Sequence, residues 1–565
     1  MSTNTEDESF HPLGAEWESE LTSMLDDTEH DTELGLAMAE DAQRLVAGEL
    51  TEAEFQEKYH EQVLDEFGED ERPTADAIEE LEDEDGGLVD ALTSLADGDQ
   101  SRRDVMKKMG VGGAALGVGA LADGRDRDAN APSSGGDTSG TQWGMTIDLE
   151  VCDGCLSCMQ ACGEENNLDE GVNWMYVMAY EDDTVGAPEN PDEASVKDWP
   201  YLVRPCQHCT DAPCEKVCPT TARHTRSKDG IVLTDYDVCI GCRYCQVACP
   251  YGVNYFQWDE PDVSQDAIAE QHSDMTGDHI HDYRDRPVDS RSPRGVMSKC
   301  TFCPSRQDGY GGEDKVGTTA CMDACPPGAI QFGDVNEDGS DPSVYADYPA
   351  FGRAVENFFN GPGGAAPASP LPSIDEIESE LGTTGEATLD EAFDLFQIDF
   401  VQSSYFSVNG YELIGTIRAI TIIADDIELS NDLDRNRSMA AAVEEARAYN
   451  DALVAAGIDF ESTEVRRTLN LGEETFGDAR STLKSVFGDE ASAFNLLEEV
   501  GTSPNVTYIG NEPGPHAQQI PAEEIPEGKN VTQYSDITYS RADGSDASVV
   551  DNRMDVIEEE TVRGL

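Results

Sequence analysis

The stretch that decides the fold runs from Cys206 to Cys249 and reads CQHCTDAPCEKVCP (206–219), then a spacer, then CIGCRYCQVACP (239–250). In each half, three cysteines stand at short intervals, and a fourth follows and directly precedes a proline. Bacterial ferredoxins bind two [4Fe–4S] clusters with this spacing, and the fourth cysteine of each run ligates the cluster of the other run. The predicted ligand sets are Cys206, Cys209, Cys214 and Cys249 for one cluster, and Cys239, Cys242, Cys245 and Cys218 for the second.

Two further cysteine motifs flank this stretch. The upstream motif, WGMTIDLEVCDGCLSCMQACGEENN (143–167), has Gly163 where the central motifs have proline. The downstream motif, KCTFCPSRQDGYGGEDKVGTTACMDACPPGAIQFGD (299–334), has a long loop between its second and third cysteines. By the same exchange rule, the two outer motifs pair with each other. The predicted ligand sets are Cys152, Cys155, Cys158 and Cys325 for one cluster, and Cys300, Cys303, Cys321 and Cys162 for the other.

The chain is therefore predicted to hold four [4Fe–4S] clusters, which use all 16 of its cysteines. No cysteine is left for a disulfide framework, so the cysteine count does not indicate an oxidising compartment. The spacer DGIVLTDYDV (229–238) alternates like a pair of strands joined by a turn. The predicted fold class is α+β, with tandem ferredoxin-like modules over residues 142–334.

The composition is strongly acidic. Asp and Glu number 117 against 36 Lys and Arg, which gives a net charge of −81. Such a surface argues against binding to nucleic acid or to anionic membranes, since both need basic residues. Widespread disorder and adaptation to high salt both fit this charge, and the patterned apolar residues, 38% of the chain, favour a halophile protein.

Residues 1–100 predict an acidic helical N-terminal domain. They carry 33 acidic and 3 basic residues, yet apolar residues recur at helical spacing in ELGLAMAEDAQRLVAGEL and TEAEFQEKYHEQVLDEFG. Thr51 and Glu54 form a predicted capping box, and Gly68 is the predicted end of that helix.

Residues 101–122 resemble a twin-arginine export signal. Arg102 and Arg103 precede a weakly apolar run of small residues from Val111 to Ala122. The run is 12 residues long, shorter than the ~20 that span a membrane. Export to the outer face of the membrane is therefore predicted, and cleavage after Ala122 would remove the N-terminal domain. The alternative is a surface helix that closes this domain, because export signals normally start a chain.

The remaining segments flank the predicted cluster core. Residues 123–141 are a predicted flexible linker, and residues 335–490 a linker and an α/β insertion. Within the insertion, ITIIADDIEL (420–429) has a strand-like pattern and MAAAVEEARAYNDALVAAG (439–457) a helical one. Residues 491–565 are predicted to complete the core and then to form an extended polar tail.

Residues 143–332, with LLEEVGTSPNVTYIG at 496–510, resemble the iron–sulfur subunit of the dimethyl sulfoxide reductase and polysulfide reductase family. The shared features are the four motifs in this order, the widened CxxCx4C of the second and the long gap in the fourth. A zinc ribbon would use only paired CxxC units, so the pattern argues against one. Respiratory nitrate reductase relatives carry tryptophan at the position of Cys242, so that branch is disfavoured.

The resemblance implies a non-catalytic subunit that carries electrons. Its implied partners are a membrane subunit that binds quinol or quinone and a catalytic subunit with a molybdopterin cofactor. The outer cluster pair would lie toward the catalytic subunit and the central pair toward the membrane subunit. No catalytic residue is predicted in this chain, because no nucleophile with a base and no phosphate-binding glycine loop stands out.

Two alternatives keep the clusters but change the partners: a haem-linked or hydrogenase-linked quinone oxidoreductase without molybdenum, and a soluble polyferredoxin. A location on the cytoplasmic face also stays open. One charge observation bears on partners: residues 201–258 contain five acidic and six basic residues, a net charge of +1. Either another subunit covers this segment, or its bases offset the negative charge of the clusters.

Overall fold

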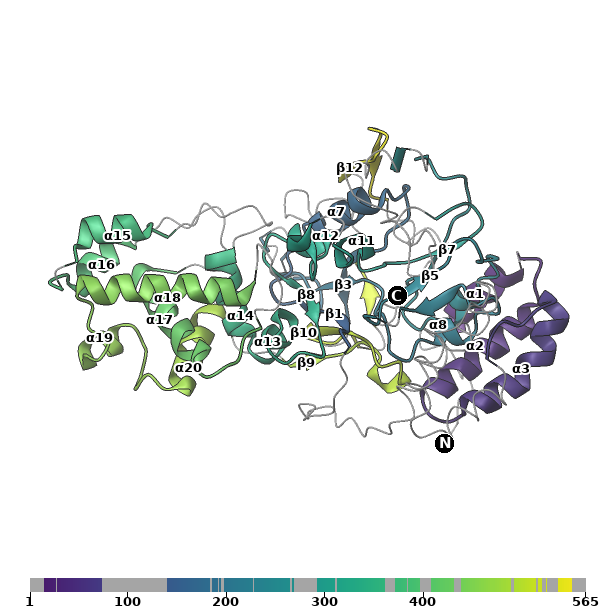
Figure 1. Ribbon diagram of the computed structural model, residues 1–565, viewed down its shortest axis with the longest axis horizontal. Coiled ribbons are helices and arrows are strands. Elements are labelled where there is room, and N and C mark those ends of the chain that lie inside the picture. The colour runs from purple at the N-terminus through teal and green to yellow at the C-terminus, as the bar shows by residue number, and fades with distance from the viewer. Residues whose placement is uncertain are drawn as a thin grey trace, which may run out of the picture.

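The computed structural model describes residues 15–73, 140–268 and 292–550, with shorter gaps inside these ranges. Three parts follow one another along the long axis of the molecule (Figure 1). The N-terminal helices lie at one end, the cysteine-rich core lies in the middle, and a helical domain lies at the other end. The predicted export segment at 101–122 and nearly all of the linker at 123–141 lie outside the described residues.

The N-terminal part consists of α1 (Ala15–Asp26), α2 (Thr32–Val46) and α3 (Glu52–Phe67). The structure confirms the capping box at α3, where Thr51 and Glu54 each bond the backbone of the other. It also confirms that Gly68 ends this helix, in a left-handed conformation with φ of 78°. Apolar side chains on the inner faces of the three helices are buried, and they include Leu21, Met38 and Phe55.

The core is built on a four-stranded sheet in the order β8-β1-β10-β9. Its strands are β1 (Trp143–Asp148), β8 (Ile330–Asp334), β9 (Ala493–Phe494) and β10 (Val506–Ile509). Met145 of β1 pairs with Phe332 of antiparallel β8 and with Val506 of parallel β10. The segment near residue 500 thus pairs with the strand that begins the core, as expected for a core-completing segment.

Smaller sheets and short helices carry the cysteine motifs. A second sheet joins β2 (Tyr176–Glu181), β3 (Tyr201–Arg204) and β11 (Gln518–Gln519). The two-stranded pairs are β4 (Arg223–Thr225) with β5 (Val232–Thr234), β6 (Tyr255–Phe256) with β7 (Met297–Ser298), and β12 (Thr538–Ser540) with β13 (Asp546–Ser548). The helices are α7 (Ser157–Asn166), α8 (Pro213–Lys216), α9 (Tyr244–Ala248), α11 (Pro304–Gln307), η2 (Glu313–Lys315), α12 (Ala320–Asp323) and η5 (Glu498–Val500).

The insertion is helical in its described residues, so the predicted α/β insertion is wrong there. The run ITIIA, predicted as strand, ends helix α17 (Gly410–Ala424). A capping box between Asn409 and Glu412 starts this helix, and its apolar side chains are buried in a core of its own. The predicted helix at 439–457 is confirmed as α18 (Met439–Ala456). The other helices are α13 (Asp341–Asp347), α14 (Pro349–Val355), the π-helix η3 (Glu356–Asn360), α15 (Ile374–Leu381), α16 (Leu389–Leu395), α19 (Thr463–Thr468) and α20 (Phe476–Phe487).

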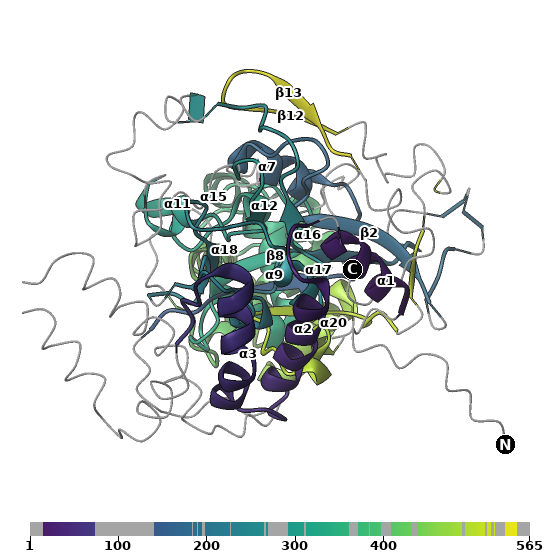
Figure 2. The ribbon, with the colours of Figure 1, turned by 90° about the vertical axis from the view of Figure 1, so that its right-hand side faces the viewer.

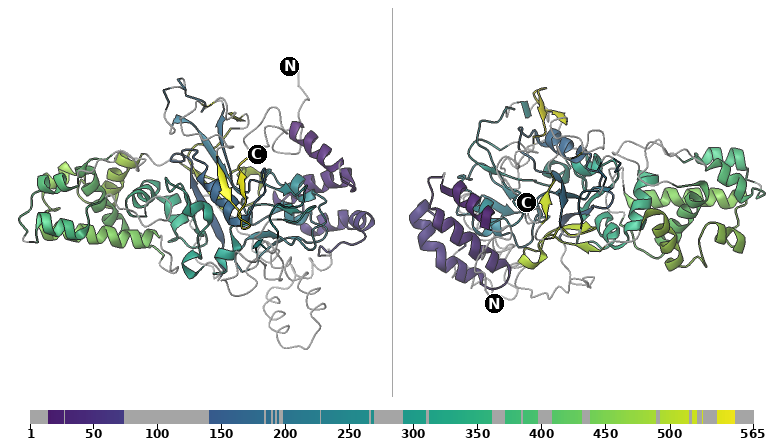
Figure 3. Two further views of the ribbon diagram at one scale, coloured as in Figure 1. Left: turned by 90° about the horizontal axis from the view of Figure 1, so that it is seen from above. Right: turned by 180° about the vertical axis from the view of Figure 1, so that it is seen from behind.

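The N-terminal helices pack directly on the central cysteine motifs. Helix α2 contacts both α8 and α9, and Figures 2 and 3 show the three helices against this end of the core. Lys216 of α8 forms an ion pair with Glu52 at 3.1 Å, and Tyr244 of α9 donates a hydrogen bond of 2.7 Å to the carbonyl of Asp31. The basic segment at 201–258 is therefore covered in part by this chain itself, which neither charge interpretation included. Among the helices of the described ranges, none has the length and apolar character needed to cross a membrane.

Candidate metal centres

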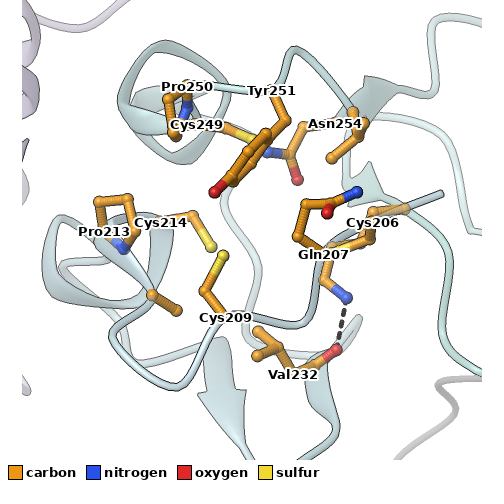
Figure 4. A pocket seen from close by; sticks show the side chains of 13 residues that line it. Cys206, Gln207, Cys209, Pro213, Cys214, Val232, Cys249, Pro250, Tyr251 and Asn254 are labelled. Atoms are coloured by element: carbon orange, nitrogen blue, oxygen red, sulfur yellow. Dashed lines mark hydrogen bonds between the residues drawn. The ribbon is translucent and has the colours of Figure 1, made fainter. Parts of the chain in front are cut away.

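Three cavities in the core are each lined by four cysteines. The first is lined by Cys206, Cys209, Cys214 and Cys249, whose side chains Figure 4 shows together. The second is lined by Cys218, Cys239, Cys242 and Cys245. The third is lined by Cys152, Cys155, Cys158 and Cys325. Each set combines cysteines from two motifs, in the grouping that the exchange rule predicts.

The last four thiols also lie near one another. Burial raises the pKa of the Cys162 thiol well above its ordinary value, and the nearby thiols of Cys300, Cys303 and Cys321 raise it further. The structure thus brings together all four predicted sets. That these cysteines ligate iron stays a prediction, since the proximity of thiols does not itself show a bound metal.

The backbone around the cysteines takes left-handed conformations at matching places. Gly154 and Leu156 have φ of 64° and 61° in the first motif, and Gly241 and Arg243 have φ of 69° and 65° in the third. These residues turn the chain between successive cysteines. Leu156 and Arg243 are the N-cap residues of α7 and α9. At Gly241 a Cβ atom would lie 2.1 Å from the carbonyl oxygen of Gly295, so this turn requires glycine.

Backbone amides point at several of the sulfur atoms. His208 N lies 3.4 Å from Cys206 Sγ, Arg223 N 3.4 Å from Cys218 Sγ, and Ala329 N 3.3 Å from Cys325 Sγ. Such N–H···S contacts favour a thiolate over a thiol and tune an iron–sulfur cluster that the thiolate holds. The turns therefore supply hydrogen-bond donors as well as ligands.

The chemistry of the thiol sets fits a multinuclear metal cluster. Burial raises the pKa of the thiols of Cys158, Cys209 and Cys242 well above the ordinary value, so without a metal they would stay protonated. A coordinated metal removes these protons, because thiolates are the binding form. No group of three or more His, Cys, Asp or Glu within the described ranges could hold a single metal ion. Four thiolates from two motifs are the ligand set that a [4Fe–4S] cluster takes.

The four thiol sets form one series through the core. The charge of Cys321, in the second outer set, raises the pKa of Cys158 in the first outer set, so these two thiols are near each other. In the same way, Cys206 of the central motifs raises the pKa of Cys300, and Cys245 raises that of Cys214. The order is therefore the Cys152 set, the Cys300 set, the Cys206 set and the Cys239 set.

Exposure differs between the ends and the middle of this series. As whole residues, Cys152, Cys155 and Cys239 are half-buried, whereas the other thirteen cysteines are buried. All three half-buried cysteines belong to the two terminal sets. The inner two sets are enclosed by protein.

Arg223 is a buried functional candidate that the motif spacing did not single out. It is 1% exposed, and its guanidinium lies 3.5 Å from Cys245 Sγ and 2.7 Å from Asn254 Oδ1. Burial lowers the pKa of Arg223, but the nearby thiols of Cys245 and Cys214 outweigh it and raise the pKa overall. The sequence signal that could have pointed to Arg223 is the net charge of +1 in residues 201–258, within a chain of net charge −81.

The chain matches two family models. Residues 11–75 match the N-terminal region of 4Fe-4S ferredoxin iron-sulfur binding proteins, and residues 197–277 match a 4Fe-4S dicluster domain. The first match covers the acidic helical domain, whose sequence showed no chemistry of its own. The second covers the central motifs and their spacer.

Several named proteins are similar to the cysteine-rich core. A Halobacterium salinarum protein, named as an iron-sulfur subunit of dimethyl sulfoxide reductase, is 40% identical over 210 residues, which cover 36% of this chain and 71% of that protein. The menaquinone reductase iron-sulfur cluster-binding subunit of Nitratidesulfovibrio vulgaris is 37% identical over 216 residues, 34% of this chain and 76% of that protein. The arsenate respiratory reductase iron-sulfur subunit of a Shewanella species is 36% identical over 208 residues, 34% of this chain and 82% of that protein.

Proposed function

Because this chain belongs to the family of iron–sulfur subunits of molybdopterin oxidoreductases, we propose that it carries electrons through four [4Fe–4S] clusters in a respiratory complex. The resemblance seen in the four motifs is thereby confirmed at the level of the family. When bound, each cluster would accept and release one electron at a time. The sixteen cysteines would hold the clusters in the four sets described above.

The single series of thiol sets is the observation that carries this proposal. Helix α7 packs on α12, Lys299 beside Cys300 lines the cavity of the Cys206 set, and α8 packs on α9, so four bound clusters would form one continuous path. The half-buried cysteine residues belong only to the two sets at its ends. Enclosed inner sites with accessible ends suit transfer between two other proteins better than reaction with a small substrate.

The exposed surface at one end supports a protein partner there. Ile240, beside Cys239, is 44% exposed, and Trp258 is 57% exposed. The Arg243 guanidinium lies over the rings of both Phe256 and Trp258, at 4.2 and 4.0 Å from their centroids. We propose that the membrane quinone-linked subunit docks on this patch, and that the molybdopterin catalytic subunit docks at the opposite end. The similarity to a menaquinone reductase subunit supports the quinone link.

The location is likewise part of the proposal. The twin-arginine-like residues Arg102 and Arg103 support assembly in the cytoplasm and export in folded form. A net charge of −81 supports a protein that works in high salt. Replacing both arginines by lysine should leave the complex in the cytoplasm, and unchanged localisation would remove the export proposal.

The test is purification of the complex from membranes in high salt, through a C-terminal tag, with metal analysis and mass spectrometry. The expected result is four irons and four acid-labile sulfides for each of four clusters, with molybdenum or tungsten and a large pterin-binding chain. Iron without either metal would favour the haem-linked or hydrogenase-linked alternative, and a free chain would favour a polyferredoxin. Absence of iron would overturn all three.

A further inference from the structure

Lys299 lies at the junction between the two inner thiol sets. It directly precedes Cys300, and its side chain lines the cavity that contains Cys206. The thiols of Cys206 and Cys300 are themselves close enough for the charge of one to raise the pKa of the other. Lys299 is 2% exposed, so its ammonium group is enclosed between the outer and central halves of the core.

This buried ammonium group has no carboxylate partner in the described ranges. Its Nζ donates to the carbonyl oxygen of Val232, the contact drawn as the dashed line in Figure 4, and to the carbonyl oxygen of Cys300 at 2.8 Å. Two other buried or half-buried bases of the core have carboxylate partners: Lys216 pairs with Glu52, and Arg226 with Asp229. An isolated charge is costly to bury, so Lys299 requires negative charge of another kind nearby.

Thiolate ligands are the remaining source of negative charge near Lys299, because the other groups around it supply none. His208 stacks on Phe302 with ring centroids 3.7 Å apart and accepts a hydrogen bond of 3.0 Å from Val232 N. An imidazole carries no negative charge in its neutral or its protonated form, so His208 cannot balance the Lys299 ammonium group. Arg223 and Arg226, the other charged groups that act on His208, are both cations.

We propose that Lys299 is a positioning residue for electron transfer, whose fixed positive charge raises the reduction potentials of the two clusters that flank it, those of the Cys206 and Cys300 sets. This inference rests on the proposed function. Each step moves one electron from a donor cluster to an acceptor cluster, without a proton or a bond change. The acceptor gains one negative charge, and a nearby cation in a dry site stabilises that reduced form. Both inner clusters thereby become better electron acceptors at the point where the outer pair meets the central pair.

The test compares variants of the whole complex by redox titration followed with electron paramagnetic resonance. Lys299→Met and Lys299→Gln remove the charge, and Lys299→Arg keeps it. Lys228→Met is the matched control, because Lys228 lies on the same core but is 52% exposed and paired with Asp308. Iron and acid-labile sulfide are measured first in every variant.

The neutral variants should lower two of the four midpoint potentials by at least a tenfold change in the reduction equilibrium, which is about 59 mV for one electron. The other two midpoint potentials should shift by less than about 59 mV. In Lys299→Arg all four potentials should stay at their wild-type values. Lys228→Met should shift none of them. Unchanged potentials at full iron content would overturn the inference, as would an equal shift of all four. Loss of iron in both neutral variants would assign Lys299 to cluster assembly instead. A wild-type chain without four clusters would refute the proposed function before any variant is compared.

Discussion

Arg223 in the central pair of cluster sites and Arg306 in the outer pair both lie near cysteine thiols, but of the two only Arg306 has carboxylate partners among the described residues. Arg306 bonds Glu165 at 2.8 Å and Asp323 at 2.7 Å, with 12% of its side chain exposed. Arg223 is buried more deeply and bonds the neutral amide of Asn254. The ligand chemistry of the two pairs is the same, so the surrounding charge is what can separate their reduction potentials.

The N-terminal helices add to this difference, since their contacts are with the central pair. Glu52 neutralises Lys216 within the second motif, and the Met24 carbonyl accepts a hydrogen bond of 2.8 Å from Arg243 in the third. The central pair is thus cation-rich inside and covered on one side by an acidic domain. The outer pair is balanced by its own carboxylates.

The largest expected effect separates the two pairs by their ligands. Cys242→Ser should disturb one cluster of the central pair, and Cys155→Ser should disturb one cluster of the outer pair. A serine oxygen is a poorer iron ligand than a thiolate, so each variant should lose or convert one cluster and keep three. Iron analysis and electron paramagnetic resonance check this. Identical spectra for the two variants, or an unaltered spectrum in either, would refute the ligand sets.

A smaller effect is expected from exchanging the charge patterns around the two arginines. Asn254→Asp gives Arg223 a carboxylate, and Asp323→Asn takes one from Arg306. The first should lower the potentials of the central clusters and the second should raise those of the outer clusters, each by about 60 mV or less. Redox titration of the intact complex checks both signs.

The control for this exchange is Asn254→Leu, which is of similar size and uncharged. Asn254 Nδ2 donates a hydrogen bond of 3.0 Å to the Cys245 carbonyl, and both variants at this position lose that bond. A drop in potential with Asp but not with Leu isolates the charge. Equal drops would show that the hydrogen bond matters and that the two arginines do not explain the difference.

The cysteine grouping was accessible from sequence because ligation of one cluster forces ligands into short, regular intervals. The structure gathers three of these sets around cavities and places the thiols of the fourth set near one another, with Gly241 at a turn that only glycine can make. The local signals at α3 were equally direct, since a capping box is a contact between residues three apart. The capping box and the three closely spaced cysteines of each motif depend on neighbours in the chain, whereas the fourth ligand of each set follows from the exchange rule between motifs.

The parts that sequence reasoning missed depend on contacts between distant residues. The isoleucine-rich run in α17 has high strand propensity. It forms a helix because Asn409 caps the helix start and because its apolar side chains are buried in the core of the helical domain. Glu52 and Lys216 are 164 positions apart, so the acidity of the N-terminal domain alone gave no sign of the surface it covers. The sequence shows Lys299 as part of KCTFC. It does not show that Lys299 has no carboxylate partner among the described residues.

The smallest effect concerns the contact between the N-terminal helices and the central pair. Burial lowers the pKa of Lys216, but the charges of Glu52 and Glu215 outweigh it and raise the pKa above the ordinary value. The ion pair therefore stabilises docking fully below about pH 10.4, the unfolded value for lysine, and the stabilisation is lost as pH rises through the folded pKa. Docking should accordingly be insensitive to pH between about 6 and 9.

Glu52→Gln tests this contact, because it leaves the Lys216 ammonium, with 14% of its side chain exposed, without its partner. Docking should weaken by about 1 kcal/mol, and the potential of the Cys206 cluster should rise, since a negative charge has been removed near it. Hydrogen exchange of α2 and redox titration measure the two effects. Glu57→Gln on the exposed face of the same helix removes the same charge and should change neither. If both substitutions act alike, the N-terminal domain influences the central pair only through its total charge, and the ion pair at Lys216 has no specific part in the difference between the two pairs.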